Sequence, residues 1–195
     1  ERRLFHFGEK IPLFVDTVAP KNNPSETYPY FDLPYCKPPE PMKHKAQTLG
    51  EVLQGSRKIY SNYDISFGVD VPNATLCTRV LDRKDVATFR NAILNKFYFT
   101  TNVNDEQIRP YGYVGEIDSD SKKVLLNTDF IFNIYHFRNR IVDVDFRTDP
   151  ATRCEVPDKD MMDKLERMEV VCTFTYSVKW LETSITFEER LTKEK

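Results

Sequence analysis

Val170-Val-Cys-Thr-Phe-Thr-Tyr-Ser-Val-Lys-Trp-Leu181 is the most regular stretch of the 195-residue chain. Its even positions up to Trp180 hold Val, Cys, Phe, Tyr, Val and Trp, and the odd positions from Thr173 to Lys179 hold Thr, Thr, Ser and Lys. Successive side chains of a strand point to opposite faces, so this alternation predicts one buried and one mostly wet face. Each buried large apolar side chain contributes roughly 1.5–3 kcal/mol, so six of them predict a central strand of the core.

Other segments with period-two apolar residues predict further strands. They are Ile11–Val18, Tyr63–Val71, Thr75–Leu81, Arg109–Ile117, the hairpin of Lys123–Phe137 and Arg140–Phe146 with Asn139 at its turn, and Ser184–Leu191. Pro72 and Asn73 are expected to form a turn. Gly112 and Gly115 are typical of bulges or of close backbone approach. The chain is therefore predicted to be mainly β, an antiparallel β-sandwich.

One segment has the period of an amphipathic helix. In Asp82–Lys96 and just beyond it, apolar residues at positions 86, 89, 93 and 97 lie three or four apart, on one helical face. Asp82, with Asp85 three residues later, suits the N-cap. We predict a helix over about residues 82–97, packed on the sandwich, and two shorter ones at Leu49–Gly55 and Met161–Met168.

Composition limits the class of protein. The chain carries 28 basic and 30 acidic residues, so it lacks the positive excess typical of nucleic-acid binding. No apolar run approaches the roughly 20 residues of a membrane-spanning helix. With 40% hydrophobic residues, the sequence is expected to form one domain over residues 1–195.

Motifs for chemistry are sparse. There is no Gly-x-Ser-x-Gly, no phosphate-binding glycine loop, no Cys-x-x-Cys and no histidine pair at ligand spacing. The prediction is therefore no catalytic residue, no metal and no cofactor. A rival hypothesis is a hydrolase that uses His136 with Asp143 and Asp145 across the hairpin. Another is copper(I) binding through thioethers, at Met161, Met162 and Met168.

The four cysteines and one sequon point to a compartment. Cys36, Cys77, Cys154 and Cys172 are widely spaced and even in number, which fits two disulfides in an oxidising compartment or four reduced thiols in the cytosol. Asn73-Ala74-Thr75 is an acceptor for N-glycosylation, which occurs in the secretory pathway. The sequon therefore favours the oxidising compartment.

Ala19–Pro41 is too rich in proline for regular structure. It carries four aromatic residues between positions 28 and 35: Tyr28, Tyr30, Phe31 and Tyr35. We favour packing of these side chains against the body of the protein. The alternative is an exposed interaction strip, either for a peptide or for a sugar in a lectin-like sandwich.

Several stretches together resemble the nonaspanins, the transmembrane 9 superfamily. They are Ile11-Pro12-Leu13-Phe14-Val15, Asn23-Pro24-x-Glu26-Thr27-Tyr28-x-Tyr30, Leu33-Pro34-x-Cys36, Leu49-Gly50-Glu51-Val52-Leu53-x-Gly55, Gly112-Tyr113-Val114-Gly115-Glu116 and Tyr176-Ser177-Val178-Lys179-Trp180. They occur in family order over about residues 11–190. Tyr35 stands where the family usually has Phe.

The resemblance implies the amino-terminal lumenal domain of a Golgi or endosomal membrane protein, ahead of nine membrane helices that this chain lacks. It also implies a non-enzymatic role in sorting membrane proteins and delivering them to the surface, in adhesion and in phagocytosis. Expected partners are the protein's own membrane domain and cargo membrane proteins, with the carboxyl end near the bilayer and the isolated domain monomeric. Of three disulfide connectivities, we expect Cys36–Cys77, whose members match family motifs, with Cys154–Cys172.

Overall fold

The strand predicted over residues 170–181 forms as β15 (Glu169–Glu182). The computed structural model describes residues 3–109 and 111–193. Along β15 the buried side chains are those of Val170, Cys172, Phe174, Tyr176, Val178 and Trp180. The side chains between them are exposed or half-buried. This alternation confirms the predicted strand and directs its apolar face toward the interior.

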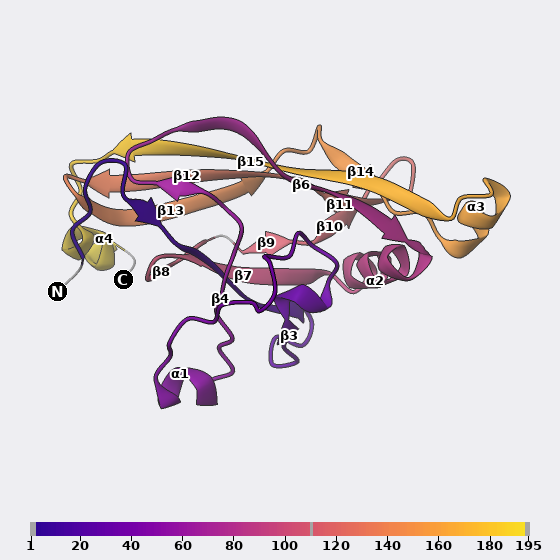
Figure 1. Cartoon of the computed structure of the whole chain (residues 1–195), viewed down its shortest axis with the longest axis horizontal. Coiled ribbons are helices and arrows are strands. Elements are labelled where there is room, and N and C mark those ends of the chain that lie inside the picture. Colours follow the sequence, from indigo (N-terminus) through magenta and orange to yellow (C-terminus); the bar gives the residue numbers. More distant parts are fainter. Residues whose placement is uncertain (1–2, 110, 194–195) are drawn as a thin grey trace.

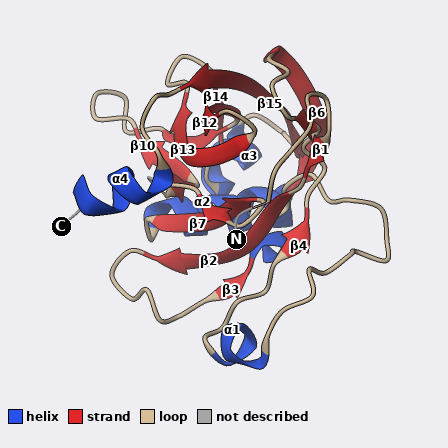
Figure 2. Ribbon diagram, turned by 90° about the vertical axis from the view of Figure 1, so that its left-hand side faces the viewer, coloured by secondary structure: helices blue, strands red, loops and turns tan. Residues whose placement is uncertain are grey.

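Two layers of strands enclose the core (Figures 1 and 2). One layer is a four-stranded sheet in the order β13 (Arg140–Thr148), β12 (Asp129–Phe137), β15 and β6 (Val71–Asp82). The other is a six-stranded sheet of β2 (Leu13–Pro20), β3 (Tyr28–Pro29), β4 (Ile59–Tyr60), β7 (Phe97–Val103), β8 (Glu106–Gln107) and β9 (Gly112–Tyr113). The ring of Phe99 lies 5.9 Å from that of Phe130 and 5.8 Å from that of Phe146, so aromatic side chains join the layers. The predicted mainly-β class is confirmed.

Smaller elements complete the chain. β1 (Lys10–Ile11) pairs with β5 (Ile65–Ser66), and β11 (Val124–Asn127) pairs with both β10 (Gly115–Ile117) and β14 (Arg153–Glu155). The helices are η1 (Tyr30–Asp32), α1 (Leu49–Leu53), α2 (Arg83–Leu94), α3 (Lys159–Lys164) and α4 (Phe187–Lys193). The short helices predicted near residues 49–55 and 161–168 correspond to α1 and α3.

One strand pair departs from the predicted antiparallel arrangement. β12 and β15 run parallel, with Phe130 opposite Tyr176 and Ile134 opposite Trp180. A parallel pair requires a crossover of a dozen or more residues, and residues 138–168 supply it. The remaining strand pairs of the described chain are antiparallel. The last long strand thereby enters the sheet between two strands that precede it in the chain.

The amphipathic helix forms as predicted. The Asp82 side chain accepts a hydrogen bond from the Asp85 N–H (2.8 Å), and the Asp85 side chain accepts one from the Asp82 N–H (3.3 Å). This reciprocal capping box satisfies two N–H groups at the start of α2. The buried face of α2 consists of Val86, Phe89, Ala92 and Ile93. The helix packs on β10, β11 and β6, and so closes one end of the core.

Gly112 and Gly115 allow the close approach that the sequence predicted. A Cβ on Gly112 would lie 2.2 Å from Cζ of Phe99, and a Cβ on Gly115 would lie 2.2 Å from the backbone oxygen of Leu125. Both sites exclude a side chain. The strand predicted over Arg109–Ile117 is divided into β9 and β10, which belong to different sheets, and its residue 110 lies outside the described residues.

The strand predicted over Ser184–Leu191 is wrong, because most of this segment is helix α4. Its start is fixed by Thr186 and Glu189: the Glu189 N–H donates to Thr186 Oγ1 (3.4 Å) and the Thr186 N–H donates to Glu189 Oε2 (2.8 Å). This Thr-x-x-Glu capping box outweighs the period-two spacing of Ile185 and Phe187.

One more strand prediction and one turn prediction need correction. Tyr63–Val71 is not a continuous strand: it contains the two-residue β5 and the first residue of β6, because Gly68 turns the backbone between them with a φ of 75°. The turn predicted at Pro72 and Asn73 does not form, since both residues lie within β6. β6 is an edge strand, where proline is tolerated, and the register with β15 shifts at this point.

The first arm of the predicted hairpin is also divided. Residues 124–127 form β11 of a small sheet, and β12 starts at Asp129 in the large one. Thr128 marks the change of sheet, where its carbonyl accepts from the Thr175 N–H (2.9 Å). The turn at Asn139 between β12 and β13 forms as predicted.

Candidate recognition surface

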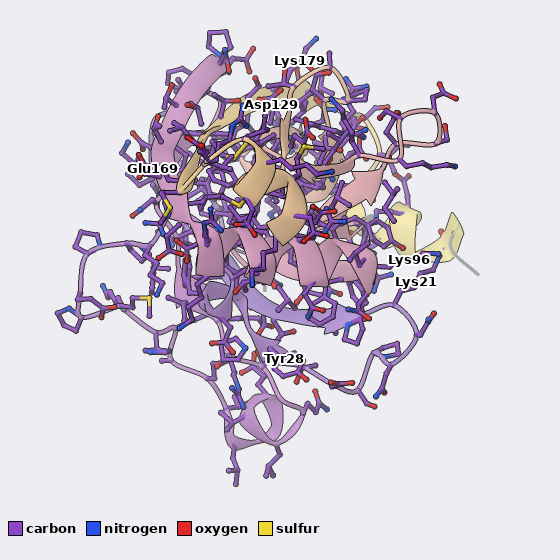
Figure 3. The ribbon with its side chains drawn as sticks, turned by 90° about the vertical axis from the view of Figure 1, so that its right-hand side faces the viewer. Lys21, Tyr28, Lys96, Asp129, Glu169 and Lys179 are labelled. Carbon is purple, nitrogen blue, oxygen red and sulfur yellow. A yellow bond between two sulfur atoms is a disulfide. The ribbon has the colours of Figure 1, made fainter. Side chains whose placement is uncertain are left out.

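The aromatic strip considered from sequence is mostly core. Tyr30, Phe31 and Tyr35 are buried. The Tyr30 and Tyr35 rings stack at 4.7 Å, and burial raises the pKa of both hydroxyls well above the usual value. Only Tyr28 of the four is exposed, on the side from which α1 projects (Figure 3). The interaction-strip hypothesis is therefore wrong for three of its four residues, and the packing interpretation holds for these three.

Disulfides explain why this proline-rich segment docks. Cys36 is bonded to Cys77 of β6, with Cα atoms 6.0 Å apart, and the guanidinium of Arg79 donates to the Pro34 carbonyl (3.2 Å). A second bond joins Cys154 of β14 to Cys172 of β15, with Cα atoms 5.8 Å apart. The structure thus contains both expected pairs. The first bond ties the irregular segment to the sheet, and the side chains of Tyr30, Phe31 and Tyr35 are buried beneath it.

The residues of the hydrolase hypothesis do not converge. His136 Nδ1 lies 2.9 Å from the Arg138 carbonyl oxygen, and its ring packs 5.5 Å from that of Phe67. Asp143 and Asp145 lie on β13 opposite Tyr135 and Asn133, whose side chains alternate with the core-facing ones of β12. Asp143 forms an ion pair with Arg190 at 3.0 Å. Imidazole and carboxylates therefore lie on different faces of the sheet.

The methionines of the copper hypothesis differ in their surroundings. Met162 of α3 is buried in the core, whereas Met161 and Met168 are exposed. No group of three or more His, Cys, Asp and Glu side chains that could hold a metal occurs within residues 3–109 and 111–193. The described part of the chain therefore offers no convergent donor set.

An exposed tyrosine cluster, which the sequence did not predict, lies on the outer face of the six-stranded sheet. The ring of Tyr98 on β7 stacks on that of Tyr111 at 5.4 Å and meets that of Tyr113 edge-on at 6.5 Å. Tyr111 and Tyr113 are 41% and 39% exposed. Tyr98 and Tyr113 face outward because their neighbours Phe99 and Gly112 face the core, so period-two alternation is the signal that could have found them. Tyr98, Tyr111 and Tyr113 are called the tyrosine cluster below.

A polar groove of about 370 Å³ adjoins the tyrosine cluster at Tyr98. Its floor is the outer face of β2 and β7 with Thr100 and Asn102, and Gln107 of β8 lies at its side. Its other wall is the loop around α1, which contributes Ser56 and Lys58. Hydroxyl, amide and ammonium groups thus line a hollow beside a flat aromatic surface.

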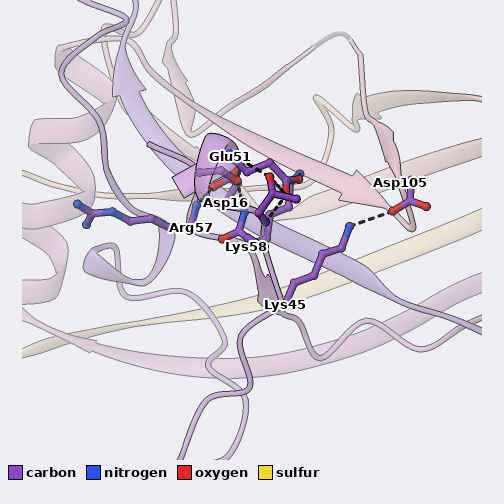
Figure 4. A network of polar contacts seen from close by, with 9 residues as sticks. Asp16, Lys45, Glu51, Arg57, Lys58 and Asp105 are labelled. Carbon is purple, nitrogen blue, oxygen red and sulfur yellow. Dashed lines mark hydrogen bonds and ion pairs between the residues drawn. The ribbon is translucent and has the colours of Figure 1, made fainter. Parts of the chain in front are cut away.

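The wall of the groove is anchored to the sheet by polar contacts (Figure 4). Asp16 of β2 accepts hydrogen bonds from the Arg57 N–H and the Ser56 hydroxyl (3.2 Å). The ammonium of Lys58 lies 3.6 Å from the Glu51 carboxylate. Hydrogen bonds from Thr48 lower the pKa of Glu51, and Lys58 acts in the same direction. The loop therefore holds its position over the sheet without a buried apolar contact from α1.

A second hollow, of about 380 Å³, borders the tyrosine cluster at Tyr113. Lys21 and Lys96 lie side by side on its rim (Figure 3), where the Lys21 N–H donates to the Lys96 carbonyl (3.2 Å). The tyrosine cluster is thus flanked by two hollows, one polar and one with a mixed polar and apolar lining. Tyrosine combines a rigid apolar ring with a polar tip, which suits contact with another molecule. The arrangement offers aromatic and polar groups for contact with another molecule.

Within the described ranges, none of the helices combines the length and the apolarity needed to cross a bilayer.

Comparison with known proteins gives the family. Residues 27–195 match the family described as Endomembrane protein 70. The chain is 36% identical to "Transmembrane 9 superfamily member 3" of Arabidopsis thaliana, over 95% of this chain and 31% of the relative. It is 36% identical to "Transmembrane 9 superfamily member 1" of Rattus norvegicus, over 91% of this chain and 30% of the relative. It is 30% identical to "Putative phagocytic receptor 1b" of Dictyostelium discoideum, over 95% and 31%. The chain therefore spans about a third of the length of these relatives, and no solved structure matches it significantly.

Proposed function

The chain belongs to the Endomembrane protein 70 family, the transmembrane 9 superfamily, and we propose from this premise that it is the non-enzymatic recognition domain of a membrane protein. The observation that carries the proposal is the exposed tyrosine cluster between two hollows. The relatives' names specify a membrane protein family and, for one of them, a phagocytic receptor, and none specifies a reaction.

We place this domain on the lumenal side of Golgi or endosomal membranes, or at the cell surface. Disulfides persist in oxidising compartments, which supports an extracytoplasmic location for a chain with two of them. Its partners would be the protein's own membrane region and cargo membrane proteins, and its role their sorting and surface delivery. A tethered domain has a high effective concentration for neighbours, so the isolated domain is expected to be monomeric and to bind weakly.

The first prediction tests the tyrosine cluster in the full-length protein. Replacing Tyr98, Tyr111 and Tyr113 together with Ala should weaken cargo binding about tenfold or more, because truncating a central interface aromatic costs about 1–2 kcal/mol. The measurement is the amount of cargo co-isolated and delivered to the cell surface.

The matched control for this variant is Val80→Ala with Val171→Ala. These two side chains are 51% and 60% exposed and pair across the outer face of the other sheet. The control should retain delivery, and both variants should keep the thermal transition of the parent. Normal delivery by the tyrosine variant would refute the recognition surface.

A sugar is the second candidate ligand, and the observation that favours it is the polar groove beside Tyr98. An aromatic face next to hydroxyl and amide groups suits the apolar and polar faces of a pyranose. Titration of the chain with oligosaccharides, followed by NMR, tests it. Shifts confined to residues around Tyr98 would support a lectin, and no shift at millimolar sugar would exclude it.

The second prediction concerns Asn73, which is exposed on edge strand β6. We expect a glycan there, because the sequon lies at a register shift where the strand is accessible. Expression in a eukaryotic secretory host, followed by glycosidase treatment, should lower the mass of the protein. Thr75→Ala removes the sequon and should abolish that change. An unchanged mass of the parent chain would contradict the prediction.

A further inference from the structure

The loop that carries α1 projects from the body and ends in exposed apolar side chains. Leu49, Val52 and Leu53 are 74%, 53% and 77% exposed. Residues spaced by three and four share one face of a helix, so these three form a single surface, called the apolar tip below. Figures 1 and 2 show α1 at the far end of its loop, away from both layers. The apolar tip adds nothing to the core and points to an external partner.

The helix beneath the apolar tip is fixed before any partner arrives. Thr48 Oγ1 accepts from the Glu51 N–H (3.3 Å) and the Thr48 N–H donates to Glu51 Oε2 (2.8 Å), forming a capping box. The base of the loop is held by the Asp16 contacts described above and by the ion pair of Lys45 with Asp105 at 2.9 Å (Figure 4). The apolar face is therefore presented on an ordered support, which lowers the entropic cost of binding.

The loop that carries the apolar tip has a positive net charge. Residues 37–58 hold five basic and two acidic residues, whereas the whole chain holds 28 and 30. Lys37, Lys43 and Arg57 are exposed, and no carboxylate within residues 3–109 and 111–193 forms an ion pair with them. This loop is thus a basic segment of a slightly acidic chain, and its charge is complementary to an anionic surface.

We propose that the apolar tip inserts into the surface of a phospholipid bilayer. Leu49, Val52 and Leu53 would enter the boundary between head groups and acyl chains, while cations of the same loop contact head-group phosphates. A protein groove that accepts a helix binds apolar anchor side chains over two helical turns, at positions i, i+3, i+4 and i+7. Five-residue α1 is too short for that pattern, whereas a bilayer requires no complementary shape.

This inference goes beyond the recognition function and stands on another surface. Leu49, Val52 and Leu53 do not line the groove next to the tyrosine cluster. Three side chains and a few cations give only weak membrane affinity on their own. In a protein already tethered to a membrane, weak affinity is enough to fix the orientation of the domain, because the local concentration of lipid is high.

The third prediction measures this binding directly. The chain is mixed with vesicles of phosphatidylcholine alone, or with about one third phosphatidylserine, and the bound fraction is read by flotation. We expect binding to the anionic vesicles that weakens as salt is raised. Leu49→Ser with Leu53→Ser should lower the partition coefficient about tenfold or more. Lys43→Glu with Arg57→Glu should remove the preference for the anionic vesicles.

The control is Val80→Ser with Val171→Ser, which removes exposed apolar side chains elsewhere and should leave vesicle binding unchanged. Thermal unfolding verifies that each variant is folded, as expected for changes at exposed sites. Absence of binding to anionic vesicles, or equal binding by the Leu49→Ser/Leu53→Ser variant, would overturn the proposal. The proposal would also be overturned if the chain did not bind vesicles but captured a partner protein through the apolar tip. The tyrosine-cluster variant should still bind vesicles, so the two proposals fail separately.

Discussion

Gly115→Ala should destabilise the fold by about 3 kcal/mol or more and lower the melting temperature by about 6–12 °C. The added methyl group would lie 2.2 Å from the Leu125 backbone oxygen and 2.7 Å from Cδ1 of Ile93. A strand carbonyl cannot rotate away as a flexible side chain does. Either β10 separates from β11 or α2 shifts outward, and both changes remove buried contacts.

Gly50→Ala is the matched control for this prediction. Gly50 lies inside α1, and the nearest atom to its Cβ position is Thr48 Oγ1 at 4.0 Å. Alanine there gains up to about 1 kcal/mol of helix propensity without a clash. Calorimetry should therefore place this variant at or slightly above the melting temperature of the parent. If Gly115→Ala melts with the parent as well, the close approach of β10 to β11 is wrong.

Removing the Cys36–Cys77 disulfide should cost about 4 kcal/mol, the second large effect. The bond closes a loop of 41 positions, and in the chain-entropy model a loop of this length gives that value. At about 2–4 °C per kcal/mol for a chain of this size, Cys36→Ala with Cys77→Ala should lower the melting temperature by about 8–16 °C.

The Cys36–Cys77 variant should also expose the docked segment. Tyr30 and Tyr35, buried beside this bond, should become accessible to a tyrosine-modifying reagent near neutral pH. Cys154→Ala with Cys172→Ala is the control, because it removes the other bond, which closes 18 positions, and leaves the docked segment tied. Unchanged stability and reactivity of the Cys36–Cys77 variant would mean that the segment docks by packing alone.

Elements with strong periodicity were predictable from the sequence. β15 combines six inward apolar residues with polar ones between them, and α2 combines a three-and-four stripe with the Asp82 and Asp85 cap. In both elements the local pattern and the tertiary packing favour the same structure, so the local pattern alone is enough to predict it. The parallel pairing of β15 with β12 depends on the path of the crossover, which no local pattern records.

Short elements depend on local capping hydrogen bonds or on position in the sheet. The Thr186 capping box selects a helix where Ile185 and Phe187 suggest a strand. Pro72 with Asn73 predicts a turn, but the missing N–H of Pro72 costs little on edge strand β6. Edge position is a property of the finished sheet, so the sequence could not supply it.

The recognition surface does not follow from the sequence for a related reason. In the proline-rich segment no period separates inward from outward side chains, so the orientation of Tyr30 and Tyr35 had to come from the structure. Tyr98 and Tyr113 do lie in alternating segments, but only the pairing of β7 with β9 brings them together. A surface assembled from two strands becomes visible once their register is known.

The order of strands in the four-stranded sheet has a consequence for synthesis. β15 is the central partner of β6, yet it begins at Glu169, about 90 residues after β6 ends at Asp82. Ribosomes add about 5–20 residues per second, so β15 is synthesised on the order of 4–17 s after β6. The six-stranded sheet is complete earlier, by Tyr113, although β2 also precedes its partner β7 by a long segment. In the lumenal location proposed above, Cys77 and the Asn73 sequon would therefore be accessible to oxidising and glycosylating enzymes before β15 pairs with β6.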